Sequence, residues 1–428
     1  MVGMCMFLDL IGNMRKKNYC KLMNYFSKGY DMKLLYIHQH YEENKGATRS
    51  YELSKRFIEN GAKVVMISGQ GDSHVTKGGL VVKSTHTTYH QKMKKMRRIL
   101  AFIHFFLWSI ILGMREKNID KIYATSTPLT VGLVGLILSK CKRKPFIFEV
   151  RDVWPDVPVK LGFIQNRGMI RLLKWLEMRI YKSAAHIVVL SEGMKQNLLQ
   201  KNISASKVTI AENFANQKLV QESNEKELED VLLKNWMKDK FVVVHPGTMG
   251  LVNGVDYLIA CAEELQYNDS IHFLLIGEGS EKQKMQAQIK EKQLTNIRIL
   301  DAKSKQETLQ VVSRCQMGTM LVKNERILWD NSANKFFDFL ACGLPVVLNY
   351  QGWQKQALEE CGAGKGFSHE EVDAYCTYVV SLAADQRSWE QAHQASKKLA
   401  EKYDIDRIAN RIWRVIMNTR SVPVETLD

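Results

Sequence analysis

The sequence lacks most of the short motifs that assign a chemistry directly. It has only 7 prolines in 428 residues, which excludes a long proline-rich linker. None of its eight cysteines forms a C-x-x-C pair, so we expect reduced thiols in a cytosolic protein and no cysteine metal site. It has neither a G-x-G-x-x-G fingerprint nor the G-K-S or G-K-T ending of a phosphate loop. The nucleotide-binding folds that depend on those two motifs are therefore disfavoured.

Acidic residues are also few relative to basic ones. The chain has 61 Lys and Arg against 45 Asp and Glu, giving a formal net charge of +16. Such an excess predicts an anionic partner: nucleic acid, an acidic membrane surface or a phosphorylated substrate. The sequence has no zinc-finger spacing and no aromatic RNA-binding signature, so we expect no nucleic-acid partner.

The first 31 residues lack the basic start, apolar core and small-residue cleavage site of a signal peptide. The character of the chain changes at Met32, where a strand-like run begins. We interpret residues 1–31 as an N-terminal extension upstream of the native start, outside the fold.

Short apolar runs then alternate with helical patterns, such as those at 49–60, 169–182 and 255–266. Continuous β-branched runs are typical of parallel strands buried on both faces. The candidate strands are 34–37, 64–67, 121–124, 146–150, 187–190 and 208–211, then 241–245, 272–276, 297–300, 318–322 and 345–349. This β-α-β rhythm occurs twice and predicts an α/β protein of two doubly wound, Rossmann-like domains facing each other across a cleft.

The predicted domain boundaries follow from a polar, charged break in this pattern. We expect a first domain at 32–216, a linker at 217–240, a second domain at 241–387, and a helix with a tail at 388–428 that packs back on the first domain. One segment interrupts the rhythm: basic residues between 92 and 98 precede an apolar, aromatic run to Met114. The run is short for a membrane span, so we interpret 92–114 as a helix in the membrane interface; the alternative is a buried domain helix.

Two stretches of the first domain are candidates for chemistry. Gly46 lies in a turn between the first strand and a helix, where a backbone can approach a phosphate or sugar. Arg151 and Asp152 follow a buried strand, where charge is costly unless it is paired or used. Asp152 could orient or deprotonate an acceptor hydroxyl, and Arg151 could hold that hydroxyl or contact a phosphate. A structural ion pair at the strand end is the alternative.

Two stretches of the second domain predict a site for a phosphorylated ligand. Gly247, Thr248 and Gly250 follow its first strand and form a candidate phosphate turn. Further on, Asn334, Lys335 and Asp338 begin a helix, with Asp330 eight residues before Asp338. A carboxylate there can accept hydrogen bonds from a ribose diol, and Lys335 and Lys323 can neutralise a diphosphate.

At these residues the sequence resembles family 4 of the retaining glycosyltransferases, which have the GT-B fold. The resemblance runs from Met32 to about Ile416. Within it, 149–155 and 334–345 are similar to the L-fucosamine-type transferases of O-antigen and capsule assembly, bacterial enzymes that act on lipid-linked sugars at the inner membrane face.

The resemblance implies roles for individual residues. The family carries a Glu-x7-Glu signature, and Asp330 and Asp338 fall at its spacing, both as Asp. Asp338 matches the ribose-binding carboxylate, and Asp330 matches the sugar-contacting one by spacing alone. The Arg and Lys that often follow the phosphate turn are absent, so Lys323 and Lys335 are expected to supply their charge. Many members have a histidine after the strand ending at Glu149, a place that Arg151 and Asp152 take here.

The implied activity is transfer, with retention, of an N-acetylated or deoxy-amino hexose from a UDP-sugar to a polyprenyl-diphosphate-linked acceptor. No D-x-D motif stands at a suitable strand end, so we expect no metal and no cofactor besides the nucleotide-sugar donor. The expected location is the cytoplasmic face of the inner membrane, with an anionic membrane surface as a partner. Two alternatives stay open: a nucleotide-sugar epimerase of the same fold, and a non-catalytic membrane-associated scaffold.

Overall fold

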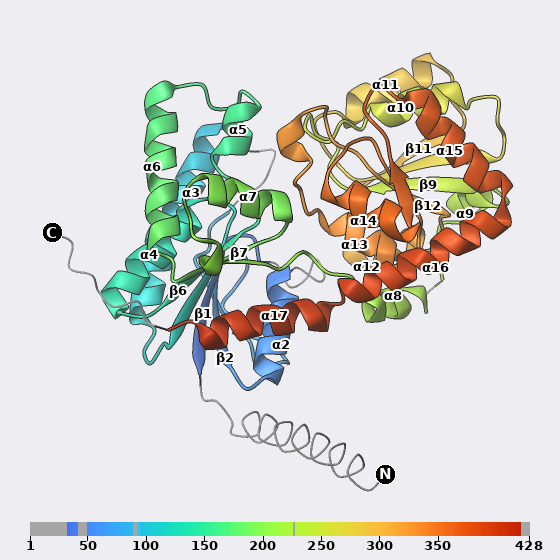
Figure 1. Cartoon of the computed structure of the whole chain (residues 1–428). Coiled ribbons are helices and arrows are strands. Elements are labelled where there is room, and N and C mark those ends of the chain that lie inside the picture. Colours follow the sequence, from blue (N-terminus) through green and yellow to red (C-terminus); the bar gives the residue numbers. More distant parts are fainter. Residues whose placement is uncertain (1–31, 42–48, 89–92, 94, 226, 421–428) are drawn as a thin grey trace, which may run out of the picture.

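The computed structural model describes residues 32–41, 49–88, 93, 95–225 and 227–420. The predicted extension at 1–31 and the candidate residue Gly46 lie outside these ranges. The described chain forms two α/β domains, each built on one central sheet (Figure 1). The fold class expected from the sequence is confirmed.

The sheet of the first domain has eight strands in the order β3-β4-β2-β1-β5-β6-β7-β8. All neighbours are parallel except β3 and β4, which are antiparallel. The strands are β1 (Lys33–His38), β2 (Lys63–Ser68), β3 (His74–Val75), β4 (Val81–Ser84), β5 (Lys121–Thr125), β6 (Phe146–Val150), β7 (His186–Val189) and β8 (Val208–Ile210). The short β3 and β4 were not predicted, because runs of two and four residues carry too little periodicity.

Helices cover both faces of this sheet. Leu35 and Ile37 face a core shared with α3, α4, α6 and α7, whereas the alternate residues Leu34 and Tyr36 face a core shared with α2 and the final helix, α17. The helices of this layer arrangement are α2 (Arg49–Glu59), α3 (Lys95–Arg115), α4 (Thr130–Lys142), α5 (Asp156–Lys160), α6 (Arg167–Ser183), α7 (Glu192–Gln200) and the 3-10 turn η1 (Ala205–Lys207).

The second domain has a six-stranded parallel sheet in the order β11-β10-β9-β12-β13-β14. The strands are β9 (Phe241–Pro246), β10 (Ile271–Ile276), β11 (Ile297–Leu300), β12 (Met317–Met320), β13 (Val346–Leu348) and β14 (Gly364–Gly366). Its helices are α8 (Gln217–Asn224), α9 (Val231–Met237), α10 (Tyr257–Glu264), α11 (Lys282–Glu291), α12 (Lys305–Val312), η2 (Arg326–Leu328), α13 (Asn334–Ala341), α14 (Trp353–Cys361), α15 (Val372–Ala384) and α16 (Gln386–Lys402).

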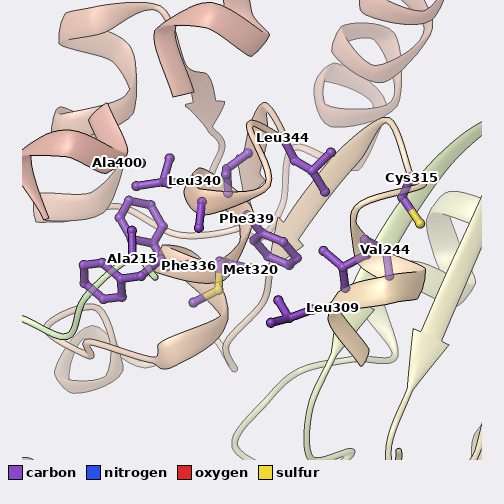
Figure 2. Close-up of a cluster of buried hydrophobic side chains, with 14 of the residues drawn as sticks. Ala215, Val244, Leu309, Cys315, Met320, Phe336, Phe339, Leu340, Leu344 and Ala400 are labelled. Atoms are coloured by element: carbon purple, nitrogen blue, oxygen red, sulfur yellow. The ribbon is translucent and has the colours of Figure 1, made fainter. Parts of the chain in front are cut away.

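Helix α13 is fixed by one of the two cores of this domain. Phe336, Phe339 and Leu340 are fully buried among side chains of α12, β12 and α16 (Figure 2). Burying large aromatic and aliphatic side chains stabilises a fold by about 1.5–3 kcal/mol each. The N-terminal residue of α13, Asn334, is thereby held in a cavity that residues of the first domain also line.

The segment 217–240 differs from the predicted linker. It forms α8 and α9, and its apolar residues Val220, Leu228 and Leu233 are buried in the core of the second domain. The charged residues around them face solvent and gave the segment its linker-like composition. The chain therefore changes domain just before α8.

The segment 388–419 forms two helices, α16 and α17 (Ile405–Asn418), separated at Tyr403 and Asp404. The Asp404 carboxylate caps α17 by accepting from the backbone N–H groups of Asp406 and Arg407. Trp413 of α17 stacks on Phe57 of α2 with ring centroids 5.7 Å apart, so the last helix packs on the first domain. The chain crosses from one domain to the other twice, at Ala215 and at Tyr403. Ala215 N–H donates to the Tyr403 carbonyl, 2.9 Å away, so these two chain crossings lie side by side.

Candidate active site

A cavity of about 500 Å³ lies between the two domains. Its first-domain wall comes from residues that follow strands, as expected for an open parallel sheet. Its second-domain wall comes from the start of α12 and the segment leading into α13. The lining residues are His38, His40, Arg49, Thr127, Arg151, Asp152, Leu190, Asn213, Lys305, Asn331, Ser332, Ala333 and Asn334.

The floor of the cavity is a buried ion pair. Arg49, at the start of α2, donates from Nε to Glu149 Oε1 at 2.8 Å, and both side chains are fully buried. Tyr123 and Thr125 also donate to the Glu149 carboxylate, at 2.9 and 2.6 Å. Burial alone would raise the pKa of Glu149, but Arg49, the hydrogen bond from Thr125 and the charge of Arg151 hold that pKa below its ordinary value. Glu149 is thus a structural anion.

Arg49 also contacts the segment after β8, through which the chain passes to the second domain. Its guanidinium donates to the carbonyls of Ala211 and Glu212 and to the side chain of Asn213, all after β8. Asn213 in turn donates from Nδ2 to the Ser332 carbonyl of the second domain. The arginine therefore connects the end of β6 with the segment that crosses between the domains.

The predicted pair Arg151 and Asp152 faces the cavity from the end of β6. Desolvation by the surrounding protein raises the pKa of the Asp152 carboxyl, and the Arg151 charge partly offsets this. A raised pKa makes a carboxylate a better proton acceptor. The pair lines the cavity, and its predicted role in handling an acceptor hydroxyl stays a prediction.

Two histidines share this wall and were not predicted. His38 is the last residue of β1 and His40 lies two residues beyond it, and the His38 ring lies 2.7 Å from the Ser50 hydroxyl. Burial and the nearby Arg151 charge lower the pKa of His38 far enough to keep it neutral at pH 7. Their position at the end of a central parallel strand is the one signal in the sequence that could have identified them.

On the second domain, the turn after β9 has the shape of an anion cradle. Gly247 has φ +137°, a conformation that favours glycine. The turn interlocks with the one after β10: Gly247 N–H donates to the Ile276 carbonyl at 2.8 Å, and a side chain on Gly277 would come within 1.9 Å of Gly247 O. Thr248 is exposed and Gly250 half-buried, so the turn presents its backbone and the Thr248 side chain to ligands.

Lys335 of α13 lies directly above this turn. Its Nζ is 2.9 Å from the point where a Gly247 side chain would begin, and 2.8 Å from His245 Nε2. Nδ1 of His245 is 2.9 Å from the Thr319 carbonyl and must carry the proton, so Nε2 accepts from Lys335. Burial lowers the pKa of Lys335 to about 7 and keeps His245 neutral.

The N-terminus of α13 adds backbone donors to the same place. Its first residue, Asn334, is exposed and lines the cavity, and the preceding Ala333 provides no side-chain cap. Free N–H groups and the helix dipole favour an anion at such an end. The glycine turn, the Lys335 ammonium and this helix start therefore form one site suited to a diphosphate.

Asp338 is paired rather than exposed to the cavity. Its carboxylate accepts from Lys305 Nζ at the start of α12, and Lys305 also lines the cavity. Lys305 was not predicted, because an isolated lysine at the start of a helix has no motif to mark it. The pair joins the start of α12 to the middle of α13.

Asp330 lies at the contact between the domains, and it is not among the residues lining the cavity in the described chain. Its backbone carbonyl accepts from Ser191 Oγ at 2.7 Å, and its carboxylate lies against Gly193 at the start of α7. A side chain on Gly193 would come within 2.0 Å of Asp330 Cγ. Lys323 is exposed, and its backbone N–H donates to the Val252 carbonyl in the loop beyond the phosphate turn.

Across residues 32–420, where described, no group of three His, Cys, Asp or Glu side chains is arranged to hold a metal ion. The expectation of metal independence stays a prediction.

Comparison with known proteins agrees with this geometry. Residues 46–218 match the family model described as Glycosyltransferase Family 4, and residues 240–385 match the one described as Glycosyl transferases group 1. The protein is a glycosyltransferase. The first match supports the family 4 resemblance seen in the sequence. No curated protein matches the chain in sequence.

Several solved structures share the fold of this glycosyltransferase. Sucrose-phosphate synthase from Thermosynechococcus elongatus superimposes with a TM-score of 0.72 at 14% identity, covering 90% of this chain and 98% of that one. HepE from Anabaena in complex with UDP gives 0.68 at 14% identity, covering 90% and 100%. WaaG, a glycosyltransferase involved in lipopolysaccharide biosynthesis, gives 0.64 at 9% identity, covering 90% and 100%.

Proposed function

We propose that this glycosyltransferase transfers an N-acetylated or deoxy-amino hexose from a UDP-sugar to a polyprenyl-diphosphate-linked acceptor during assembly of a bacterial surface polysaccharide. The observation that carries the proposal is the site formed by Lys335, the Gly247 turn and the start of α13, whose first residue, Asn334, lines the same cavity as Arg151 and Asp152. UDP in the HepE structure and the lipopolysaccharide role of WaaG support the donor and the pathway class.

In this proposal the donor diphosphate lies between the turn after β9 and the N-terminus of α13. The Lys335 ammonium and the backbone N–H groups stabilise the charge that develops as the bond between the anomeric carbon and the phosphate oxygen breaks. The acceptor hydroxyl approaches the anomeric carbon on the face that the nucleotide leaves, so the configuration is retained. Its proton passes to the departing phosphate oxygen or to Asp152, and no metal takes part.

Asp338 keeps the role of ribose contact in this proposal, with Lys305 as its partner. Because Lys305 reaches both the Asp338 carboxylate and the cavity, it can hold that carboxylate in place for the ribose hydroxyls. Asp330 acts through the domain contact at Gly193 and Ser191.

The test is a transfer assay with purified protein, a panel of UDP-, GDP- and dTDP-sugars, and a polyprenyl-diphosphate-linked sugar as acceptor. We expect a glycolipid product with a UDP-sugar only, and none with D338A. Turnover of the donor without any acceptor would indicate the epimerase alternative. Wild-type polysaccharide output from cells carrying D338A would indicate the scaffold instead.

A further inference from the structure

Helix α3 exposes an unusual amount of apolar surface for a helix of an α/β domain. Leu100 is 61% exposed, Leu107 52% and Trp108 42%. They belong to a stripe along the whole helix: Met96, Ile99, Leu100, Ile103, Leu107, Trp108, Ile111 and Met114. Contiguous exposed apolar surface of this kind marks a protein or membrane contact.

The opposite side of α3 packs on the domain. Ala101, Phe105 and Ser109 are buried at a spacing of four residues, and α3 lies against α4 along its length. Contrary to the expectation from the sequence, the helical segment Met96–Arg115 is by length and composition sufficient to cross a membrane. Because one side of the helix is buried against the domain, we infer that it lies along a membrane surface rather than across it.

Helix α6 and the loop before it carry a second apolar stripe that the sequence did not reveal. Phe163, Met169, Leu172 and Trp175 are each about half exposed, at 48–56%. Both α3 and α6 contact α4, and all three cover the same face of the sheet. The outer sides of α3 and α6 therefore point away from that sheet in the same direction. In Figure 1, α6 is on the side of the first domain that is remote from the second domain.

The exposed charged side chains of α3 and α6 are all basic. Helix α3 contains no carboxylate, and the single one in α6, Glu177, is buried and bonded to Lys201. Exposed basic residues flank the apolar ones on both helices: Arg97, Arg98, Arg167, Arg171, Lys174 and Arg179. Apolar side chains framed by Arg and Lys match a bilayer with anionic headgroups.

We propose that α3, α6 and the loop at 161–166 form one docking face for an anionic bilayer, and that docking delivers the enzyme to its lipid-linked acceptor. One continuous stretch of chain joins the cavity to this face. Arg151 and Asp152 line the cavity, α5 follows and contacts η2 across the cleft, and the loop bearing Phe163 then leads into α6. The delivery role rests on the proposed function; the docking does not.

The experiment measures binding of the full chain to vesicles of phosphatidylcholine alone and of phosphatidylcholine with phosphatidylglycerol. The test variant is L172E/W175E on α6. The matched control is V231E/L232E on α9 of the second domain, where the apolar pair is 62% and 77% exposed. We expect binding to anionic vesicles only, weakened at least about tenfold by the α6 variant and unchanged in the control.

Wild-type vesicle binding by L172E/W175E, or equal binding to neutral vesicles, would overturn the proposal. A dimer in solution that only the α6 variant dissociates would show that a second copy covers the face instead. Transfer to a water-soluble acceptor analogue separates the two proposals: L172E/W175E should keep that activity and lose transfer to the acceptor embedded in vesicles.

Discussion

The ammonium of Lys335 donates a hydrogen bond of 2.8 Å to Nε2 of His245, directly above the glycine turn at Gly247. The imidazole holds the lysine in place without neutralising it, because His245 stays uncharged. A buried cation without an anion is unstable, and this is why burial lowers the pKa of Lys335 to about 7. A diphosphate would supply the missing charge.

Replacing this lysine should therefore weaken the productive binding of the donor. A hydrogen bond to a charged group contributes about 1.5–3 kcal/mol, so K335M should lower kcat/KM by about 10- to 150-fold. Steady-state transfer kinetics with a UDP-sugar measure the effect. K234M, which removes an exposed lysine from α9, serves as the control and should be unchanged. Equal rates for K335M and the wild type would remove Lys335 from the donor site.

The same lysine predicts how donor affinity depends on pH. In the free protein its pKa is about 7, and a bound diphosphate favours the ammonium form and raises that pKa. Affinity for UDP should thus be highest below pH 7 and fall as the pH rises above 7, by at most about tenfold per pH unit. Calorimetric titration between about pH 6.5 and 9 tests this, with proton uptake on binding in the upper part of the range. A pH-independent affinity in the wild type, or the same slope in K335M, would contradict it.

The buried pair of Arg49 and Glu149 makes a prediction about stability. Removing one partner leaves an unpaired buried charge, so E149L should lower the free energy of unfolding by about 3–5 kcal/mol. The double variant R49M/E149L should recover part of the loss. E263Q, which removes an exposed ion pair with Lys292, should change it by less than about 1 kcal/mol. Urea unfolding of the four proteins is the measurement.

The contribution of Glu149 to the free energy of unfolding should decrease as the pH falls. Because the folded-state pKa of Glu149 is depressed, its contribution is present above the pKa of the unfolded chain and is lost as the pH falls through the folded value. Acid unfolding of the wild type should be steeper than that of E149L. If the acid-unfolding curves of the wild type and E149L were equally steep, Glu149 would not be held as an anion in the folded protein.

The contact of Asp330 with Gly193 separates two roles for this aspartate. If Asp330 acts by positioning the two domains, G193A and D330A should each lower kcat, and the double variant should be no worse than the poorer single one. If it contacts the donor sugar, the two effects should add. A double-mutant cycle on transfer rates decides between them, and thermal unfolding checks that G193A remains folded.

Much of the fold could be predicted because its strands are continuous apolar runs. Phe146–Val150 has the predicted bounds, and the two-domain rhythm reflects residues buried on both faces of a parallel sheet. Gly364–Gly366 was missed because a strand of Gly-Lys-Gly has no strand propensity and forms only against β13.

The site was predictable where a local motif marks it and not where packing creates it. Lys335 and Gly247 belong to recognisable stretches, whereas Lys305 reaches Asp338 from 33 residues away and has no local signal. The stripe on α6 was also missed, because its helical residues at 169–175 have the spacing of an ordinary half-buried amphipathic helix. Only the position of the sheet shows which side of that helix is covered.

The two chain crossings at Ala215 and Tyr403 also bear on how the domains can move. Because the two connections are joined by a backbone hydrogen bond, we expect the domains to rotate about this one point rather than to slide past each other. The second crossing then returns the chain to the first domain, where α17 completes a core under α2. A truncation between α16 and α17 would therefore damage the domain at the opposite end of the sequence, and the two domains cannot be separated by cutting the chain once.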